Sequence, residues 1–162
     1  MKNRSSDVSV YGVIMAGGIG KRLWPVSNQK KPKQFISFDG NSLLRRTYER
    51  IEPLIGADRT IVVTNKEMGK LVSSDLPELP EENIIEEPYR RNTAPCIGLS
   101  AVIGQKKLGL SSEGSVMAVL PADHLITEKD KFLSSIKEAI EVAKKGESLV
   151  TLGIQPPGPR TG

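Results

Sequence analysis

Closely spaced glycines follow an apolar stretch near the start of the chain. Residues 8–16 are rich in β-branched and other apolar side chains, and Gly17, Gly18 and Gly20 come directly after them. Glycines at this spacing let the backbone approach a phosphate, so that main-chain N–H groups can donate to its oxygens. A sharp turn without a ligand is the alternative. The loop lacks the third glycine of a dinucleotide fingerprint, and Arg22 stands where a P-loop has Ser or Thr.

Basic side chains are concentrated beside this loop. Residues 21–50 contain eight basic and two acidic residues, which creates a local positive field. Arg22 and Lys33 flank the glycines, where a guanidinium fork and a point charge could hold triphosphate oxygens. The amphipathic helix that follows carries three further basic residues, Arg45, Arg46 and Arg50. We expect all three on its solvated face.

These side chains must be positioned by strands and helices that alternate along the chain. The apolar pattern predicts strands at residues 8–16, 60–64, 83–87, 115–120 and 148–154. Helical spacing predicts one helix from an Asn41 or Ser42 cap to Pro53, and others over 66–74, 93–108 and 128–145. Such alternation through short links favours right-handed crossovers and a parallel sheet covered on both faces. We therefore predict a doubly wound, mainly parallel, Rossmann-like α/β fold.

Three loops at the carboxyl ends of the predicted strands hold the unusual residues of the chain. In doubly wound sheets ligands bind beyond these ends, and the loops span residues 16–22, 87–95 and 121–124. His124 is the only histidine, and we expect it to be a structural hydrogen-bonding group. Cys96 is the only cysteine, and we expect it to pack as a small hydrophobic residue.

Composition narrows the class of protein. Hydrophobic residues make up 38% of the sequence and charged residues 26%, which is typical of a folded globular domain. The net charge of +4 favours a polyanionic partner, but aromatic residues are only 4% and do not interleave with the basic ones. A nucleic-acid partner is therefore disfavoured, because such a site needs stacking platforms. One cysteine and no apolar run of roughly 20 residues favour a cytoplasmic protein without a membrane partner.

Sequence blocks along nearly the whole chain fall in one characteristic order. The first are AGGIGKRLWPVS at 16–27 and PKQF at 32–35; the others are EP at 87–88, RNTAP at 91–95, LPADH at 120–124, and GI, P and TG at 153–154, 156 and 161–162. Together they resemble the signature of the mannose-1-phosphate guanylyltransferases, within the sugar nucleotidyltransferase superfamily. The LWP and PKQF pieces separate this branch from thymidylyl and adenylyl relatives.

The resemblance implies a reaction in which the phosphate of mannose 1-phosphate attacks the α-phosphorus of GTP, giving GDP-mannose and pyrophosphate. It also implies catalytic roles for three residues. Arg22 would bind the triphosphate and favour the departing pyrophosphate, and Lys33 would neutralise charge near the α-phosphate. Asp123 would hold Mg²⁺ as a hard oxygen ligand. A turn or cap residue is the alternative role for Asp123.

The nucleotide-binding residues that the resemblance implies are Ala16, Gly17, Gly18, Gly20, Arg22, Lys33, Glu87, Asn92 and Thr93. Within this set, Glu87 precedes the proline at the position that lies over the base in the superfamily. One carboxylate can accept from N1–H and the N2 amino group of guanine together, a pattern that adenine lacks. Strand alternation would point Glu86 to the opposite face. Main-chain groups near Asn92 and Thr93 are the alternative readers of guanine.

The extent of the chain shapes the remaining expectations. The family pattern continues beyond residue 162 into a sugar-binding segment, so we expect residues 1–162 to form a single nucleotide-binding portion with little turnover alone. A nucleotide-binding module without catalysis and a nucleic-acid-binding domain are the alternative functions. A homo-oligomer is compatible with the sequence.

Overall fold

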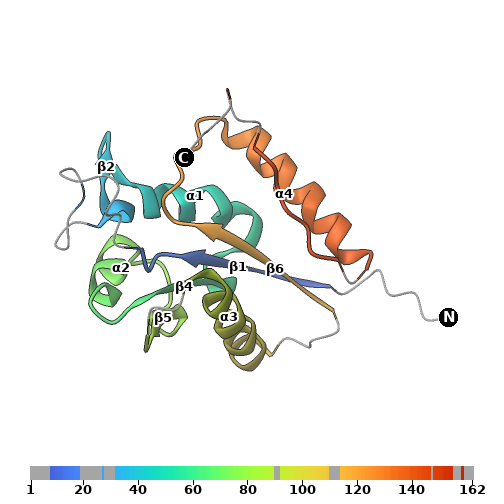
Figure 1. Ribbon diagram of the computed structural model, residues 1–162, viewed down its shortest axis with the longest axis horizontal. Helices are drawn as coiled ribbons and strands as arrows, with labels where there is room; N and C mark the ends of the chain where they lie inside the picture. The colour runs from blue at the N-terminus through green and yellow to red at the C-terminus, as the bar shows by residue number, and fades with distance from the viewer. Residues whose placement is uncertain are drawn as a thin grey trace.

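A parallel sheet with helices on both faces organises the chain (Figure 1). The computed structural model describes residues 8–18, 27, 32–89, 92–109, 114–146, 148–154 and 158. Within them, the sheet has the order β5-β4-β1-β6 and all three pairings are parallel. Its strands are β1 (Ser9–Met15), β4 (Thr60–Asn65), β5 (Ile84–Glu87) and β6 (Ser115–Pro121). The predicted α/β fold and these four strands are confirmed.

The helices also follow the predicted order. They are α1 (Leu43–Ile55), α2 (Gly69–Asp75), α3 (Thr93–Leu108) and α4 (Lys129–Lys144). Short elements complete the described chain: the hairpin strands β2 (Ser37–Phe38) and β3 (Asn41–Ser42), and the 3-10 turns η2 (Lys33–Phe35), η3 (Ala57–Arg59) and η4 (Glu81–Asn83). Ser42 caps α1, because its hydroxyl accepts from the Arg45 amide at 2.9 Å. The helix runs through Pro53 and ends two residues later, before Gly56.

Alternating side chains of the central strands form two cores. On one face, Ile14 of β1 and Val62 of β4 pack with α1 and α2, and Phe132 of α4 packs against the same cluster. On the other face, Val13 and Ile61 pack with Cys96 of α3. This two-residue period is what a strand covered on both sides requires.

Two glycines allow the helices to approach the sheet. A Cβ at Gly12 of β1 would lie 3.0 Å from the Ile55 side chain of α1. A Cβ at Gly104 of α3 would lie 2.7 Å from the Tyr11 ring of β1, closer than real contacts allow. Both positions therefore fix how closely a helix packs on β1.

The prediction of a fifth strand at 148–154 is wrong for this structure. The segment is irregular and exposed, with Leu149 fully exposed and Ile154 80% exposed. Its apolar pattern suits a strand, but a strand forms only where its backbone pairs, and β6 remains at the edge of the described sheet.

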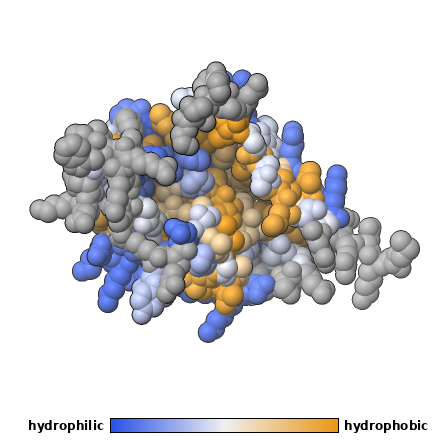
Figure 2. Space-filling view, viewed as in Figure 1, coloured by the Kyte–Doolittle hydropathy of each residue, from blue (hydrophilic) through white to orange (hydrophobic). Residues whose placement is uncertain are grey.

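Apolar surface gathers over the part of the molecule where β6 and α3 lie (Figure 2). None of the described helices is long and apolar enough to cross a bilayer.

Candidate nucleotide-binding site

The carboxyl ends of the strands bring the three predicted loops to one edge. Met15 at the end of β1 pairs with Val63 of β4 on one side and with Pro121 of β6 on the other. The ladder continues one step further, because the Ala16 amide donates to Val63 at 2.7 Å and the Ala122 amide donates to Met15 at 3.0 Å. The start of the glycine loop and the loop that carries Asp123 therefore leave the sheet side by side.

Gln34 fixes the entry to the glycine loop. Its side-chain amide donates to the Ala16 carbonyl at 2.7 Å and contacts the Met68 sulfur at 3.1 Å. The Thr64 hydroxyl donates to the same carbonyl at 3.1 Å. Gln34 and Thr64 are both buried. Gln34 was not among the predicted site residues. The signal that could have marked it is a polar side chain between Lys33 and the aromatic Phe35 in a turn.

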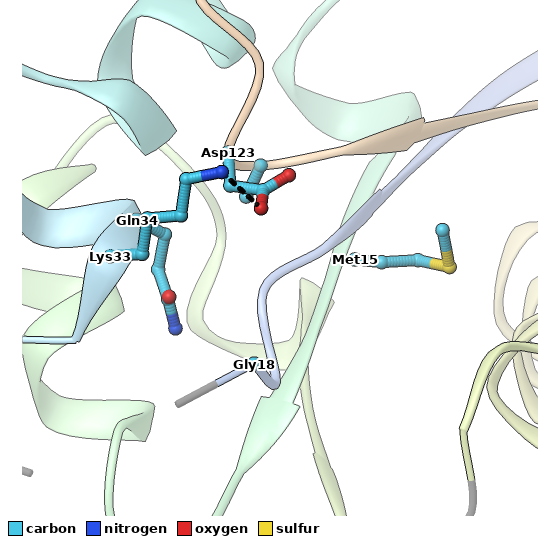
Figure 3. Close-up of a pocket in the computed structure, with 6 residues that line it drawn as sticks. Met15, Gly18, Lys33, Gln34 and Asp123 are labelled. Atoms are coloured by element: carbon cyan, nitrogen blue, oxygen red, sulfur yellow. Dashed lines mark hydrogen bonds and ion pairs between the residues drawn. The ribbon is translucent and has the colours of Figure 1, made fainter. Parts of the chain in front are cut away.

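Lys33 and Asp123 meet across a pocket, as Figure 3 shows. The Lys33 ammonium lies 2.8 Å from Oδ2 of Asp123, although 90 positions separate them in the chain. The pocket has a volume of about 140 Å³ and is lined by Met15, Gly18, Lys33, Gln34, Ala122 and Asp123. The two side chains are 28% and 39% exposed, so both remain accessible to a ligand. The structure thus joins two predicted catalytic residues beside the glycine loop.

Asp123 supplies a single carboxylate for a cation. Among the described residues, no three His, Cys, Asp or Glu side chains converge as a metal site. Nε2 of His124 lies 3.9 Å from the other carboxylate oxygen of Asp123, beyond hydrogen-bonding distance. This donor set fits a magnesium ion that takes its other oxygens from water and phosphate, since magnesium is commonly held by one or two carboxylates. The Lys33 ammonium contacts the same carboxylate and would have to leave it.

Glu87 lies between the glycine loop and α3. A Cβ at Gly17 would be 3.5 Å from Oε2 of Glu87. The pKa of the Cys96 thiol is raised to about 11, first by burial and then by the charge of Glu87 and its hydrogen bond with the thiol. Glu86 is exposed on the opposite face, against Gly69 of α2. The predicted alternation of the two glutamates is confirmed, and Glu87 is the one beside the predicted phosphate loop.

The start of α3 presents Asn92 and Thr93. Both are exposed, and Asn92 has φ +65° and ψ −165°, a backbone conformation that residues other than glycine rarely adopt. Asn92 makes no side-chain cap bond to the helix. The first amides of α3 lack partners within the helix, so these N–H groups can donate to an acceptor group of a ligand or to an anion.

Two of the predicted site residues lie outside the described part of the chain, Gly20 and Arg22. Cys96 is buried in the α3 core, as expected.

The prediction that all three arginines of α1 lie on a solvated face is wrong for one of them. Arg45 pairs with Glu78 at 2.9 Å and Arg46 pairs with Asp39, but Arg50 is buried. Its side chain points under the loop after β6, where α4 covers it, and a solvated position was therefore wrong.

The fold and this edge define the class of protein. A doubly wound α/β domain carries a glycine loop, a lysine and a carboxylate at the carboxyl ends of its strands. This placement is typical of proteins that handle nucleotides. The family model described as nucleotidyl transferase matches residues 11–162. The chain belongs to the nucleotidyl transferase family.

Curated relatives resemble the chain over almost its full length. Mannose-1-phosphate guanylyltransferase 2 of Escherichia coli O157:H7 is 40% identical over 160 residues, which are 97% of this chain and 32% of the relative. Mannose-1-phosphate guanylyltransferase of Salmonella muenchen is 43% identical over 153 residues, 93% of this chain and 32% of the relative. The chain therefore spans about a third of the length of these proteins.

A solved structure shares the fold. The crystal structure described as mannose-1-phosphate geranyltransferase from Thermus thermophilus matches with a TM-score of 0.72 and 32% identity. The match covers 85% of this chain and 39% of that one. The similarity extends to the tertiary arrangement and is not confined to short motifs.

Proposed function

We propose that this chain is the nucleotide-binding portion of a mannose-1-phosphate guanylyltransferase, which forms GDP-mannose and pyrophosphate from GTP and mannose 1-phosphate. The observation that carries the proposal is the meeting of Lys33 and Asp123 in one pocket beside Gly18. The names of the relatives supply the sugar and the base, since a pocket with a lysine and a carboxylate would suit many nucleotides.

The chain's own residues would act by positioning and by charge. An oxygen of the sugar phosphate attacks the α-phosphorus of GTP, the bond to the bridging oxygen of the β-phosphate breaks, and pyrophosphate leaves. Negative charge grows on the phosphate oxygens, so donors fixed in advance lower the barrier. The buried Gln34 and Thr64 hold the Ala16 carbonyl and so define where the glycine loop begins. Gly20 and Arg22 are proposed to contact the triphosphate together with Gly17 and Gly18.

Lys33 and Asp123 would separate when substrate binds. In the free chain the ammonium neutralises the carboxylate at 2.8 Å. A triphosphate offers Lys33 a stronger anion, and Asp123 is then available as a magnesium ligand. Bound Mg²⁺ would neutralise charge on the phosphate oxygens. Exchange of partners explains how a single carboxylate and a single lysine can serve both the free and the bound state.

Glu87 is proposed to read guanine. It is half-buried beside Gly17, and the residue of α3 that interacts with it is Cys96. An ionised carboxylate there can accept from N1–H and the N2 amino group of guanine, whereas N1 of adenine would oppose it. The amides of Asn92 and Thr93 can add contacts to the base or sugar.

Calorimetric titration of the chain with GTP and Mg²⁺ tests this function, with ATP and a short oligonucleotide as controls. We expect GTP to bind weakly but more tightly than ATP, and the oligonucleotide not to bind. Preferred binding of the oligonucleotide would contradict the proposal. An assay of GDP-mannose formation separates an enzyme portion from a binding module without turnover. We expect little product from these residues alone, and turnover equal to that of a full-length relative would contradict the fragment interpretation.

A further inference from the structure

A buried arginine lies beneath the loop that carries Asp123. Arg50 of α1 is only 4% exposed. One of its guanidinium nitrogens donates to the His124 carbonyl at 3.4 Å, and the guanidinium carbon lies 5.2 Å from the centroid of the Phe132 ring of α4. Among residues that the structure describes, no carboxylate forms an ion pair with Arg50.

The burial of this cation does not by itself stabilise the fold. Burial lowers the pKa of Arg50, and the neighbouring Arg46 lowers it further. A buried cation without an acidic partner loses hydration that a carbonyl and an aromatic face restore only in part. An apolar side chain of similar length would fill the same space without that loss. The role of Arg50 therefore lies in the two groups that it contacts, the His124 carbonyl and the Phe132 ring.

Those contacts join three elements around the Asp123 loop. The Ala122 amide is bound to Met15 at 3.0 Å, which fixes the loop on its strand side. Arg50 holds the His124 carbonyl on the helix side. Asp123 stands between these two main-chain attachments, with its carboxylate facing Lys33. Phe132 supplies the α4 wall against which the guanidinium rests.

We infer that Arg50 is a positioning residue, which fixes the main chain at His124 so that the Asp123 carboxylate faces the pocket. The inference rests on the proposed function, since the value of a fixed Asp123 lies in metal and phosphate binding. Arg50 itself touches neither the pocket nor a reacting atom. It acts through the loop.

Replacement of Arg50 by Met tests this role in the 162-residue chain. Arg50→Met keeps the length of the side chain and removes its charge, so the melting temperature should stay within about 4 °C of the parent or rise. Amide exchange measured by NMR should become about tenfold faster at Asp123, His124 and Leu125, because the loop loses one attachment. Arg46→Met is the matched control, since Arg46 lies on the same helix and pairs with Asp39. Exchange in the loop should not change in the control.

The conservative variant and a binding measurement separate positioning from simple packing. Arg50→Lys keeps a donor and a cation over Phe132, so it should restore most of the exchange protection. In calorimetry, Arg50→Met should reduce the gain in GTP affinity that Mg²⁺ provides by about fivefold to tenfold, and should leave metal-free GTP binding nearly unchanged. Arg46→Met should retain that gain.

The two measurements have distinct failures. Equal exchange rates in Arg50→Met and Arg46→Met would overturn the positioning role, whatever the nucleotide result. A parent chain that does not bind GTP with Mg²⁺ would refute the proposed function, and the exchange rates would still decide whether Arg50 holds the loop. Faster exchange with an unchanged magnesium effect would overturn the link between the loop and metal binding.

Discussion

The Ala16 carbonyl should respond to mutation in a strongly non-additive way. It is the last acceptor before the glycines, and it receives two buried side-chain donors, Gln34 at 2.7 Å and Thr64 at 3.1 Å. Gln34→Met and Thr64→Val each remove one donor while nearly keeping the side-chain volume, so little cavity energy enters. After either change the carbonyl still has one partner, and after both it has none among the described side chains.

The expected magnitudes follow from that difference. Each single substitution should lower the free energy of unfolding by about 0.5–1.5 kcal/mol, the usual contribution of one neutral hydrogen bond. Ala16 is 1% exposed, so water cannot easily replace the lost donors. The double variant should therefore lose a further 1–3 kcal/mol, roughly the penalty for leaving a buried acceptor unpaired. In a chain of this size, about 1 kcal/mol shifts the melting temperature by about 2–4 °C.

Urea unfolding of the parent, both single variants and the double variant completes the thermodynamic cycle. Thr47→Val is the control, because Thr47 is also buried and its hydroxyl donates to a different carbonyl, that of Leu43, at 2.9 Å. Its effect should add to that of Gln34→Met within about 0.5 kcal/mol. Strict additivity in the Gln34 and Thr64 cycle would refute the shared role of the Ala16 carbonyl.

Four further outcomes are expected. Lys33→Met should weaken GTP binding at least about tenfold, since a charged hydrogen bond is lost. The fold should be little affected, because the part-exposed ion pair of Lys33 contributes at most about 1 kcal/mol to folding. An unchanged calorimetric affinity would return Lys33 to a surface role. Asp123→Asn should flatten the magnesium titration of GTP binding, and a curve identical to that of the parent would leave Asp123 as a turn residue. Glu87→Gln should cost about 1–3 kcal/mol of GTP affinity and much less of ATP affinity, and equal losses would move base reading elsewhere. The Cys96 thiol has its pKa raised from 9.0 to about 11, so the unfolded chain releases this proton first and stability should fall as pH rises from 9 to 11. Cys96→Ala should show a shallower fall in denaturant titrations over that range, and an identical slope would contradict the raised pKa.

Several features of the fold could be predicted from local pattern. Helix α3 begins and ends at the predicted residues, Thr93 and Leu108, and Ser42 caps α1 as its position suggested. Glu86 and Glu87 point to opposite faces of β5, because side chains in a strand alternate whatever packs around it. The meeting of three loops at one edge also followed from sequence, since parallel strands place their carboxyl ends together.

The extent of regular structure was less well predicted. The pattern at 148–154 suits a strand, yet the segment remains unpaired and exposed. The helix α1 passes Pro53, because a proline removes one hydrogen bond without preventing the last turn from packing on the sheet. In both cases the outcome depended on the presence or absence of a neighbouring element.

The sequence by itself determined the alternation of strands and helices and the loops that carry the chemistry, because these depend on the periods of the two regular structures and on the glycine and proline positions. Tertiary structure alone decided which side chains meet. It placed Lys33 against Asp123 across 90 positions, Gln34 beneath Ala16, and Arg50 under the Asp123 loop. A basic residue on an amphipathic helix has the same local signature whether its end faces water or a neighbouring loop. Only the packing of α1 against α4 and against the loop after β6 buries Arg50, and that packing is a property of the folded domain.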